Sequence, residues 1–167
     1  GFGKTTMLCE WMEADPGGGG VGVAWLSLDA ADSDLMRFLS YLVAAVGTVA
    51  PQVSEELVAG LGSPQPAAAE VVLTDLINVV ARSPRDVVVV LDDFHVVDSA
   101  QVDQAVEFLV ERSPAQLHLV IVGREDPRLP LARWRAGGVV SELRADELRF
   151  TLAEAATFLS SVMGVEL

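Results

Sequence analysis

The chain has 167 residues, of which 51% are hydrophobic, and it carries a formal net charge of −13 at pH 7. This length suits one domain with a sizeable core, and the apolar runs are too short to cross a bilayer, so we expect a soluble, cytoplasmic protein with no membrane partner. The single cysteine, Cys9, excludes an internal disulfide. The acidic net charge argues against nucleic-acid binding by this chain, because affinity for nucleic acids depends largely on Lys and Arg.

The first six residues match the second half of a phosphate-binding P-loop, G-x-x-x-x-G-K-[ST]. In such a loop, backbone N–H groups close around phosphate oxygens, a lysine reaches the β- and γ-phosphates and a hydroxyl holds Mg²⁺. The residues that would bind the nucleotide are Gly1, Gly3, Lys4, Thr5 and Thr6, and Lys4 is the only lysine. The alternative is a plain turn before a helix. Because the first half of the motif does not precede Gly1, we expect a fragment cut inside it.

Hydrophobic patterning predicts helices that alternate with strands. Apolar residues at helical spacing predict helices over 7–12, 35–46, 57–59, 72–80, 99–113, 129–136 and 151–159. Continuous apolar runs predict strands over 21–28, 87–91, 117–122 and 139–143. Strands that are apolar on both faces are typical of a parallel sheet covered by helices. The polar turn 29–34 offers N-cap residues, and Gly137 and Gly138 are expected to end the short helix before them.

Two carboxylates, Asp92 and Asp93, follow the most apolar strand. Open α/β sheets bind ligands at the carboxyl ends of their strands. The pair resembles a Walker B element, in which Asp92 would hold the Mg²⁺ water shell and Asp93 would orient or deprotonate the attacking water. The alternative is an ordinary turn at a strand end. Together with the P-loop ending, the pair favours nucleotide binding, whereas His95 is expected to pack or hydrogen-bond rather than bind zinc.

An arginine, Arg124, comes just after the next strand. A fixed guanidinium at that edge could sense or stabilise the charge of a γ-phosphate, which makes Arg124 a candidate catalytic residue beside Asp93. The alternative is a surface ion pair with Glu125 or Asp126.

Several blocks of the sequence are similar to one family, namely GFGKTT, VAWLSLD, VVVVLDDFH, LHLVIVGREDPRLPLARWRA and ELRADELRFTLAEAATFL. They resemble the ATPase domain of large ATP-binding LuxR-type transcription regulators of the maltose-regulon activator type, within the STAND class of signalling NTPases. The resemblance implies ATP or ADP and Mg²⁺ as cofactors, with Lys4 on the phosphates, Thr5 and Asp92 at the metal, Asp93 orienting water and Arg124 as a sensor residue. Asp29 and Arg37 match family blocks without an assigned role.

The fold that the resemblance implies is α/β: a P-loop NTPase of the ASCE/STAND type, a three-layer αβα sandwich with a mostly parallel sheet of order 5-1-4-3-2, its first strand missing. We expect the NTPase core over 1–150 and the start of a helical lid over 151–167. The implied function is an ATP/ADP switch of a bacterial regulator, reset by slow hydrolysis, with self-association of the parent protein and promoter binding by another domain. The alternatives are a non-hydrolysing ATP-binding oligomerisation scaffold and an AAA-type ATPase module.

Overall fold

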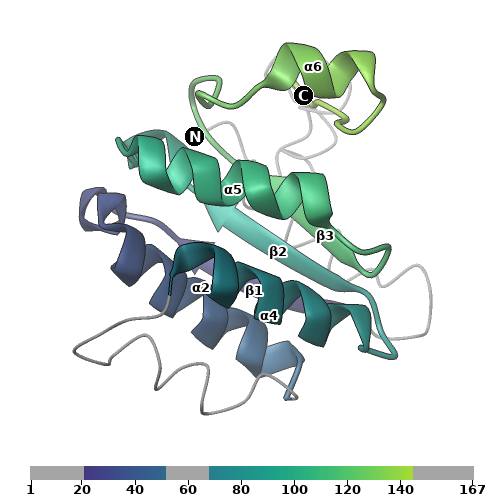
Figure 1. Cartoon of the computed structure of the whole chain (residues 1–167). Coiled ribbons are helices and arrows are strands. Elements are labelled where there is room, and N and C mark those ends of the chain that lie inside the picture. The colour runs from purple at the N-terminus through teal and green to yellow at the C-terminus, as the bar shows by residue number, and fades with distance from the viewer. Residues whose placement is uncertain (1–20, 52–67, 145–167) are drawn as a thin grey trace, which may run out of the picture. The chain divides into compact units, whose positions relative to one another are not determined.

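The computed structural model describes residues 21–51 and 68–144 (Figure 1). The chain divides into two compact units, one of residues 11–130 and one that contains residues 131–144 of the described part. The predicted P-loop residues 1–6 and the helices predicted over 7–12, 57–59 and 151–159 lie outside the described residues, as does the predicted boundary near residue 150.

The unit of residues 11–130 contains a parallel sheet of three strands in the order β1-β2-β3. The strands are β1 (Gly22–Ser27), β2 (Val87–Asp92) and β3 (Leu117–Ile121). Val87 of β2 lies opposite both Gly22 and Leu117, so the strands start level with one another. The parallel sheet and the α/β class predicted from the sequence are confirmed.

Strand β2 is buried along its whole length, because side chains on both of its faces are covered. Val87, Val89 and Leu91 point to one face and are at most 2% exposed, and Val88 and Val90 point to the other and are at most 3% exposed. Four consecutive valines suit this position, since β-branched side chains pack well on a pleated surface and have no polar group to satisfy. The prediction of a fully buried central strand is confirmed.

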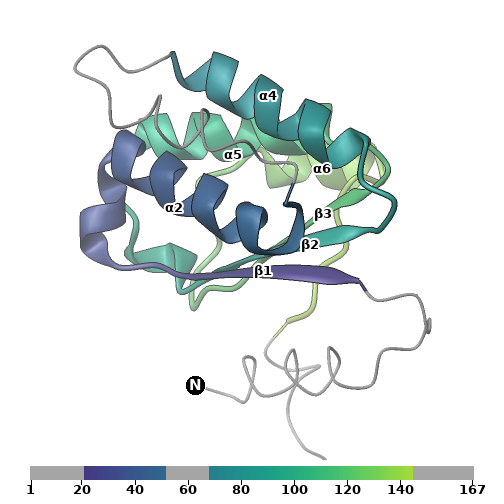
Figure 2. The ribbon, with the colours of Figure 1, turned by 90° about the horizontal axis from the view of Figure 1, so that it is seen from below.

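Three amphipathic helices form a layer on one face of the sheet: α2 (Leu35–Val49), α4 (Ala69–Ala81) and α5 (Ala100–Arg112) (Figure 2). In the sheet, β2 lies beside β1, and β3 lies on the side of β2 that faces away from β1. Crossovers between parallel strands share one hand, so both connections place their helices on the same side. None of the helices in the described part combines the length and apolar character needed to cross a bilayer.

The core lies between this helical layer and the sheet. Each helix contributes the apolar positions that recur every three to four residues, and these side chains are almost completely buried: Phe38, Leu39, Leu42, Val43 and Val46 of α2, Val72, Leu73, Leu76 and Val80 of α4, and Val102, Val106 and Leu109 of α5. At one end, a Cβ added to Gly22 would lie 2.9 Å from the Cβ of Val49. The start of β1 and the end of α2 therefore approach too closely for a side chain on Gly22.

In the second unit, helix α6 (Leu131–Ala136) ends in a Schellman motif. The N–H of Gly138 donates to the carbonyl of Arg135 at 3.1 Å, and the N–H of Val139 donates to the carbonyl of Trp134 at 2.9 Å. Gly138 has φ 67°, a conformation that costs glycine little. The prediction that the two glycines end this helix is confirmed.

The prediction of a strand over 139–143 is wrong. The segment has no ladder partner among the described strands and is not a strand in the structure. Val139 and Leu143 are 58% and 66% exposed, and Glu142 is held between two arginines, with Arg135 Nε at 2.6 Å and Arg144 Nη2 at 2.5 Å. The apolar pattern alone was not sufficient to form a strand, because a strand needs a neighbouring strand for its backbone hydrogen bonds. This segment is held by local ion pairs instead.

Candidate functional site

The ends of the three parallel strands meet at one edge of the sheet. The residues that follow them form three neighbouring loops, 28–34 after β1, 93–99 after β2 and 122–130 after β3. The predicted site residues Asp92 and Asp93 lie on the middle loop or at its start, and Arg124 lies on the loop after β3. This edge is where open α/β sheets bind their ligands. Gly1, Gly3, Lys4, Thr5 and Thr6 fall outside the described residues.

Asp92 and Asp93 are adjacent but have different environments. Asp92 ends β2 and is 8% exposed, whereas the side chain of Asp93 is 54% exposed. The N–H of Asp93 donates to Oδ1 of Asp92 at 3.0 Å. Asp93 adopts the left-handed conformation, with φ 56° and ψ 32°, which Asp tolerates better than most residues. The chain thus turns sharply between the two residues, with one carboxylate at the strand end and the other directed toward solvent.

Backbone hydrogen bonds fix this turn from both neighbouring strands. On one side, the N–H of Leu28 donates to the carbonyl of Asp92 at 3.0 Å. On the other, the N–H of Phe94 donates to the carbonyl of Val122 at 2.9 Å. The peptide groups before and after Asp93 are therefore both tied to the sheet, and the left-handed residue between them has little freedom.

His95 lies beside the exposed carboxylate. Its Nδ1 is 3.7 Å from Oδ1 of Asp93, which is beyond hydrogen-bonding range, and this buried nitrogen has no hydrogen-bond partner among the described residues. The other side of His95 faces Gly123, where an added Cβ would lie 3.7 Å from the Cβ of His95. The sequence predicted that His95 packs or hydrogen-bonds. Its position next to Asp93 follows from the short helical turn Phe94–Val96, which no pattern in the sequence indicates.

Arg124 is exposed and forms no ion pair with any residue in the described ranges. The alternative of a surface pair with Glu125 or Asp126 is therefore not seen. Another arginine of this loop, Arg128, does form an ion pair, and its Nη1 lies 2.7 Å from Oδ1 of Asp98. The N–H of Asp98 donates in turn to Oγ of Ser33 at 3.0 Å, so the three loops at this edge are connected.

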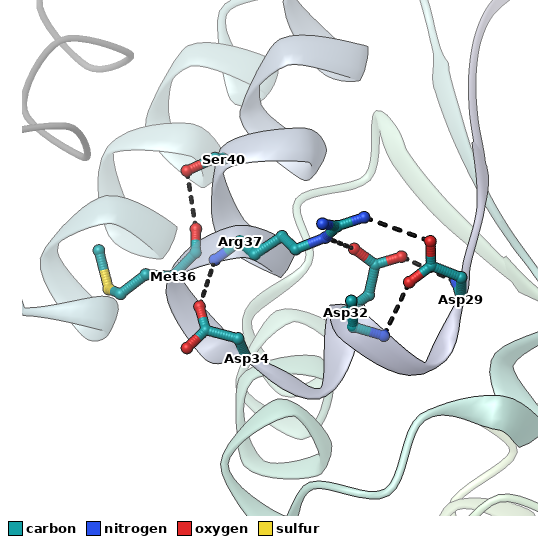
Figure 3. A network of polar contacts seen from close by, with 7 residues as sticks. Asp29, Asp32, Asp34, Met36, Arg37 and Ser40 are labelled. Carbon is teal, nitrogen blue, oxygen red and sulfur yellow. Dashed lines mark hydrogen bonds and ion pairs between the residues drawn. The ribbon is translucent and has the colours of Figure 1, made fainter.

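Asp29 and Asp32 of the loop after β1 form a network of charged side chains with Arg37 of α2 (Figure 3). The Nε of Arg37 donates to Oδ1 of Asp32 at 2.9 Å, and its Nη2 donates to Oδ2 of Asp29 at 3.2 Å. The other oxygen of Asp32 accepts the N–H of Asp29 at 2.8 Å. The hydrogen bond that Arg37 donates to Asp32 raises the pKa of Arg37 above its ordinary value. The side chain of Asp32 is 4% exposed, so it is a buried, fully engaged carboxylate.

Sequence reasoning identified Asp29 and Arg37 only by their match to family blocks and did not single out Asp32. The signal was present: Asp29 and Asp32 are three residues apart, the spacing of a capping box, and the structure has this box at the short 3-10 helix Ala30–Ser33. The described ranges contain no group of three His, Cys, Asp or Glu residues that could hold a metal ion by themselves. A Mg²⁺ ion commonly takes only one or two protein carboxylates, so a single Asp92 suits it.

No protein-family model matches the chain. It is 33% identical over 167 residues to the serine/threonine-protein kinase PknK of Mycobacterium tuberculosis, which is 100% of this chain and 15% of PknK. It is 32% identical over 160 residues to the HTH-type transcriptional regulator MalT of Cronobacter sakazakii, and 27% identical over 160 residues to that of Vibrio cholerae. These alignments cover 95% and 96% of this chain and 17% of each MalT.

The chain thus spans between 15% and 17% of the length of these relatives. All three alignments include almost every residue of the chain, and two of the relatives are regulators of one kind. The chain is therefore a homologue of one segment of the PknK and MalT proteins, which confirms the resemblance to regulators of the maltose-regulon activator type.

Proposed function

We propose that this chain is the nucleotide-binding switch domain of a transcriptional regulator, which binds ATP or ADP with Mg²⁺ and returns to its resting state by slow ATP hydrolysis. The observation that carries the proposal is the turn at the end of β2, where a buried carboxylate, Asp92, is followed by an exposed, left-handed one, Asp93. The homology to MalT, an HTH-type transcriptional regulator, supports the regulatory part.

The residues divide into phosphate, metal and water contacts. Lys4 would neutralise the β- and γ-phosphates, with the N–H groups of Gly1, Gly3 and Thr6 around them. The hydroxyl of Thr5 and the carboxylate of Asp92 would hold Mg²⁺, whose positive charge would offset the negative charge of the phosphates. These residue types fit the ion, because Mg²⁺ takes few protein oxygens and keeps several waters.

Asp93 and Arg124 would act on the reacting groups. The exposed carboxylate of Asp93 can accept a hydrogen bond from water and so orient it for attack on the γ-phosphate. Arg124, at the end of the neighbouring strand and without an ion pair in the described part, can direct its guanidinium to the same phosphate. His95, with Nδ1 at 3.7 Å from Asp93, limits where that carboxylate can move.

The parent protein would use nucleotide state to control self-association, since ATP and ADP forms that differ in contacts differ in their affinity for a second copy. This stretch would not contact nucleic acid, and promoter binding would belong to another part of the protein. Because ATP is a cytoplasmic metabolite, the protein would act in the cytoplasm.

The variant Asp93→Asn tests the proposal in the intact protein. Asn tolerates the left-handed conformation of residue 93, so the turn should be retained while the charge is lost. We expect ATP binding by calorimetry to stay within about twofold of wild type and ATP turnover to fall by about 100-fold or more. If the domain is a switch, the variant should also remain in the ATP-bound, associated form in size-exclusion chromatography.

The alternatives give different results. A scaffold that only binds ATP would show no turnover in wild type and no change in association in Asp93→Asn. The variant Lys4→Ala is the matched control for binding, because it removes the only lysine and should abolish most affinity for ATP. Unchanged ATP binding by Lys4→Ala would overturn the P-loop assignment itself.

A further inference from the structure

We propose that Arg37 and Asp32 are positioning residues for the acidic pair Asp92 and Asp93, acting through the loop that follows β1. This inference rests on the proposed function, because it assigns a role in the hydrolysis proposed above. It gives a function to the network of Asp29, Asp32 and Arg37, which contacts neither carboxylate directly.

The network fixes the start of the loop after β1. Arg37 lies on α2 and bridges Asp29 and Asp32 with two nitrogens of one guanidinium, at 3.2 and 2.9 Å (Figure 3). Asp32 receives a second hydrogen bond from the backbone N–H of Asp29 at 2.8 Å. The planar guanidinium holds two oxygens in a fixed geometry, so the backbone of Asp29 is fixed relative to α2.

A backbone hydrogen bond connects this loop to the acidic pair. Asp29 directly follows Leu28, and the N–H of Leu28 donates to the carbonyl of Asp92 at 3.0 Å. That carbonyl belongs to the peptide group joining Asp92 to Asp93, whose N–H donates to Oδ1 of Asp92. The orientation of this one peptide group therefore sets both the position of the metal-binding carboxylate and the entry into the left-handed turn at Asp93.

The pair of Arg37 and Asp32 differs in role from the cap of α2. The start of α2 is already capped by Asp34, whose Oδ1 accepts the N–H of Arg37 at 2.8 Å. The pair of Arg37 and Asp32 is therefore not needed to begin the helix. A partly buried ion pair also carries a desolvation cost, which makes it a poor source of net stability but a good means of fixing geometry.

The experiment compares variants of the intact protein in ATP turnover and in thermal unfolding of the domain. Asp32→Asn and Arg37→Met break the network. We expect the kcat for ATP to fall by about 10- to 100-fold with KM nearly unchanged, since small errors in the placement of catalytic groups lower the rate without weakening substrate binding. Arg37→Lys keeps the positive charge but cannot bridge two carboxylates in the same way, so it should restore only part of the rate.

Asp34→Ala is the matched control, because it removes the helix cap in the same loop and leaves the network in place. We expect it to lower the melting temperature while kcat stays at the wild-type value. A fall in kcat for Asp34→Ala equal to that for Asp32→Asn would show that loss of stability alone explains the effect, and would overturn the positioning role. Wild-type kcat in both Asp32→Asn and Arg37→Met would also overturn it.

The two proposals fail in different ways. If the wild-type protein binds ATP but has no turnover, the hydrolytic function is wrong and the positioning role is wrong with it. If wild type turns over ATP and Asp93→Asn does not, but the network variants retain full activity, only the positioning role is wrong.

Discussion

Asp92 and Asp93 are joined by a hydrogen bond in which the backbone N–H of Asp93 donates to Oδ1 of Asp92 at 3.0 Å. The carboxylate of Asp92 therefore has a structural partner in addition to the Mg²⁺ ion that we propose for it. A substitution of Asp92 can act through the metal, through the turn, or through both, and two different variants are needed to separate these effects.

We predict that Asp92→Asn and Asp92→Ala differ in stability but not in metal dependence. Asn keeps an oxygen that can accept the N–H of Asp93, whereas Ala leaves this donor without its partner, at a cost of about 1–3 kcal/mol. Both remove the charge, so Mg²⁺ should no longer strengthen ATP binding in either variant. Calorimetry with and without Mg²⁺, combined with hydrogen exchange at 93–97, checks both parts. Full Mg²⁺ dependence in Asp92→Asn would contradict the metal role.

The contact between Gly22 and Val49 predicts a strong effect of a single methyl group. In Gly22→Ala the new Cβ would lie 2.9 Å from the Cβ of Val49, so β1 or α2 must shift. We expect a loss of about 1–3 kcal/mol in local stability, measured by hydrogen exchange at β1 and α2 amides. Val49→Ala keeps its Cβ and should not rescue the variant, whereas Val49→Gly should. Rescue by Val49→Ala would place the conflict elsewhere.

The sequence was sufficient to predict the helices and strands that have a clear pattern of apolar residues or glycines of their own. Continuous valines identified β2, the apolar spacing identified α2, α4 and α5, and the glycine pair identified the end of α6. The segment 139–143 shows the limit, because an apolar run cannot specify whether a neighbouring strand exists. Ser99, the first residue of the helix predicted over 99–113, is the N-cap of α5, and its side chain makes no capping hydrogen bond.

The candidate site was predicted only in part for a similar reason. The order of motifs along the chain brings Asp92, Asp93 and Arg124 to the same edge, because carboxyl ends of parallel strands meet there. The contacts among loops are different. The contact of Arg37 with Asp32, five positions away, depends on side-chain directions after folding. Arg128 and Asp98 are 30 positions apart, and no spacing rule for helices or strands connects residues at that separation.

The first turn of α5 predicts a dependence of stability on pH. Partial burial raises the pKa of Asp103 above its ordinary value of 3.8, against the opposing effect of Arg128. A raised pKa in the folded state means that ionising Asp103 opposes folding, so stability falls as pH rises through that pKa. Asp103→Asn should therefore slow hydrogen exchange at α5 at neutral pH, with the advantage disappearing as pH falls toward 3.8. Asp75→Asn, an exposed carboxylate on α4, is the control. A pH-independent advantage would contradict burial as the cause.

We predict that residues 1–167 do not bind duplex DNA at physiological salt, with or without ATP. The net charge is −13, and the arginines Arg37, Arg128, Arg135 and Arg144 each pair with a carboxylate. Binding to a phosphate backbone needs basic groups that are able to replace counterions, and these four arginines already have carboxylate partners. An electrophoretic mobility assay with random duplex checks this. A shift that weakens steeply with added salt would contradict it.

The parallel order β1-β2-β3 also has a consequence for how the domain reaches its native state. Val87 pairs with Leu117, about 30 positions further on, whereas Gly22 pairs with Val87 across about 65 positions. Closing the longer loop costs more chain entropy, by roughly 0.7 kcal/mol for a flexible loop. The segment from β2 through α5 to β3 is therefore the unit that can form first, and β1 would join a strand already in place. The turn bearing Asp92 and Asp93 would thus form early, before the loop held by Arg37 takes its place beside it.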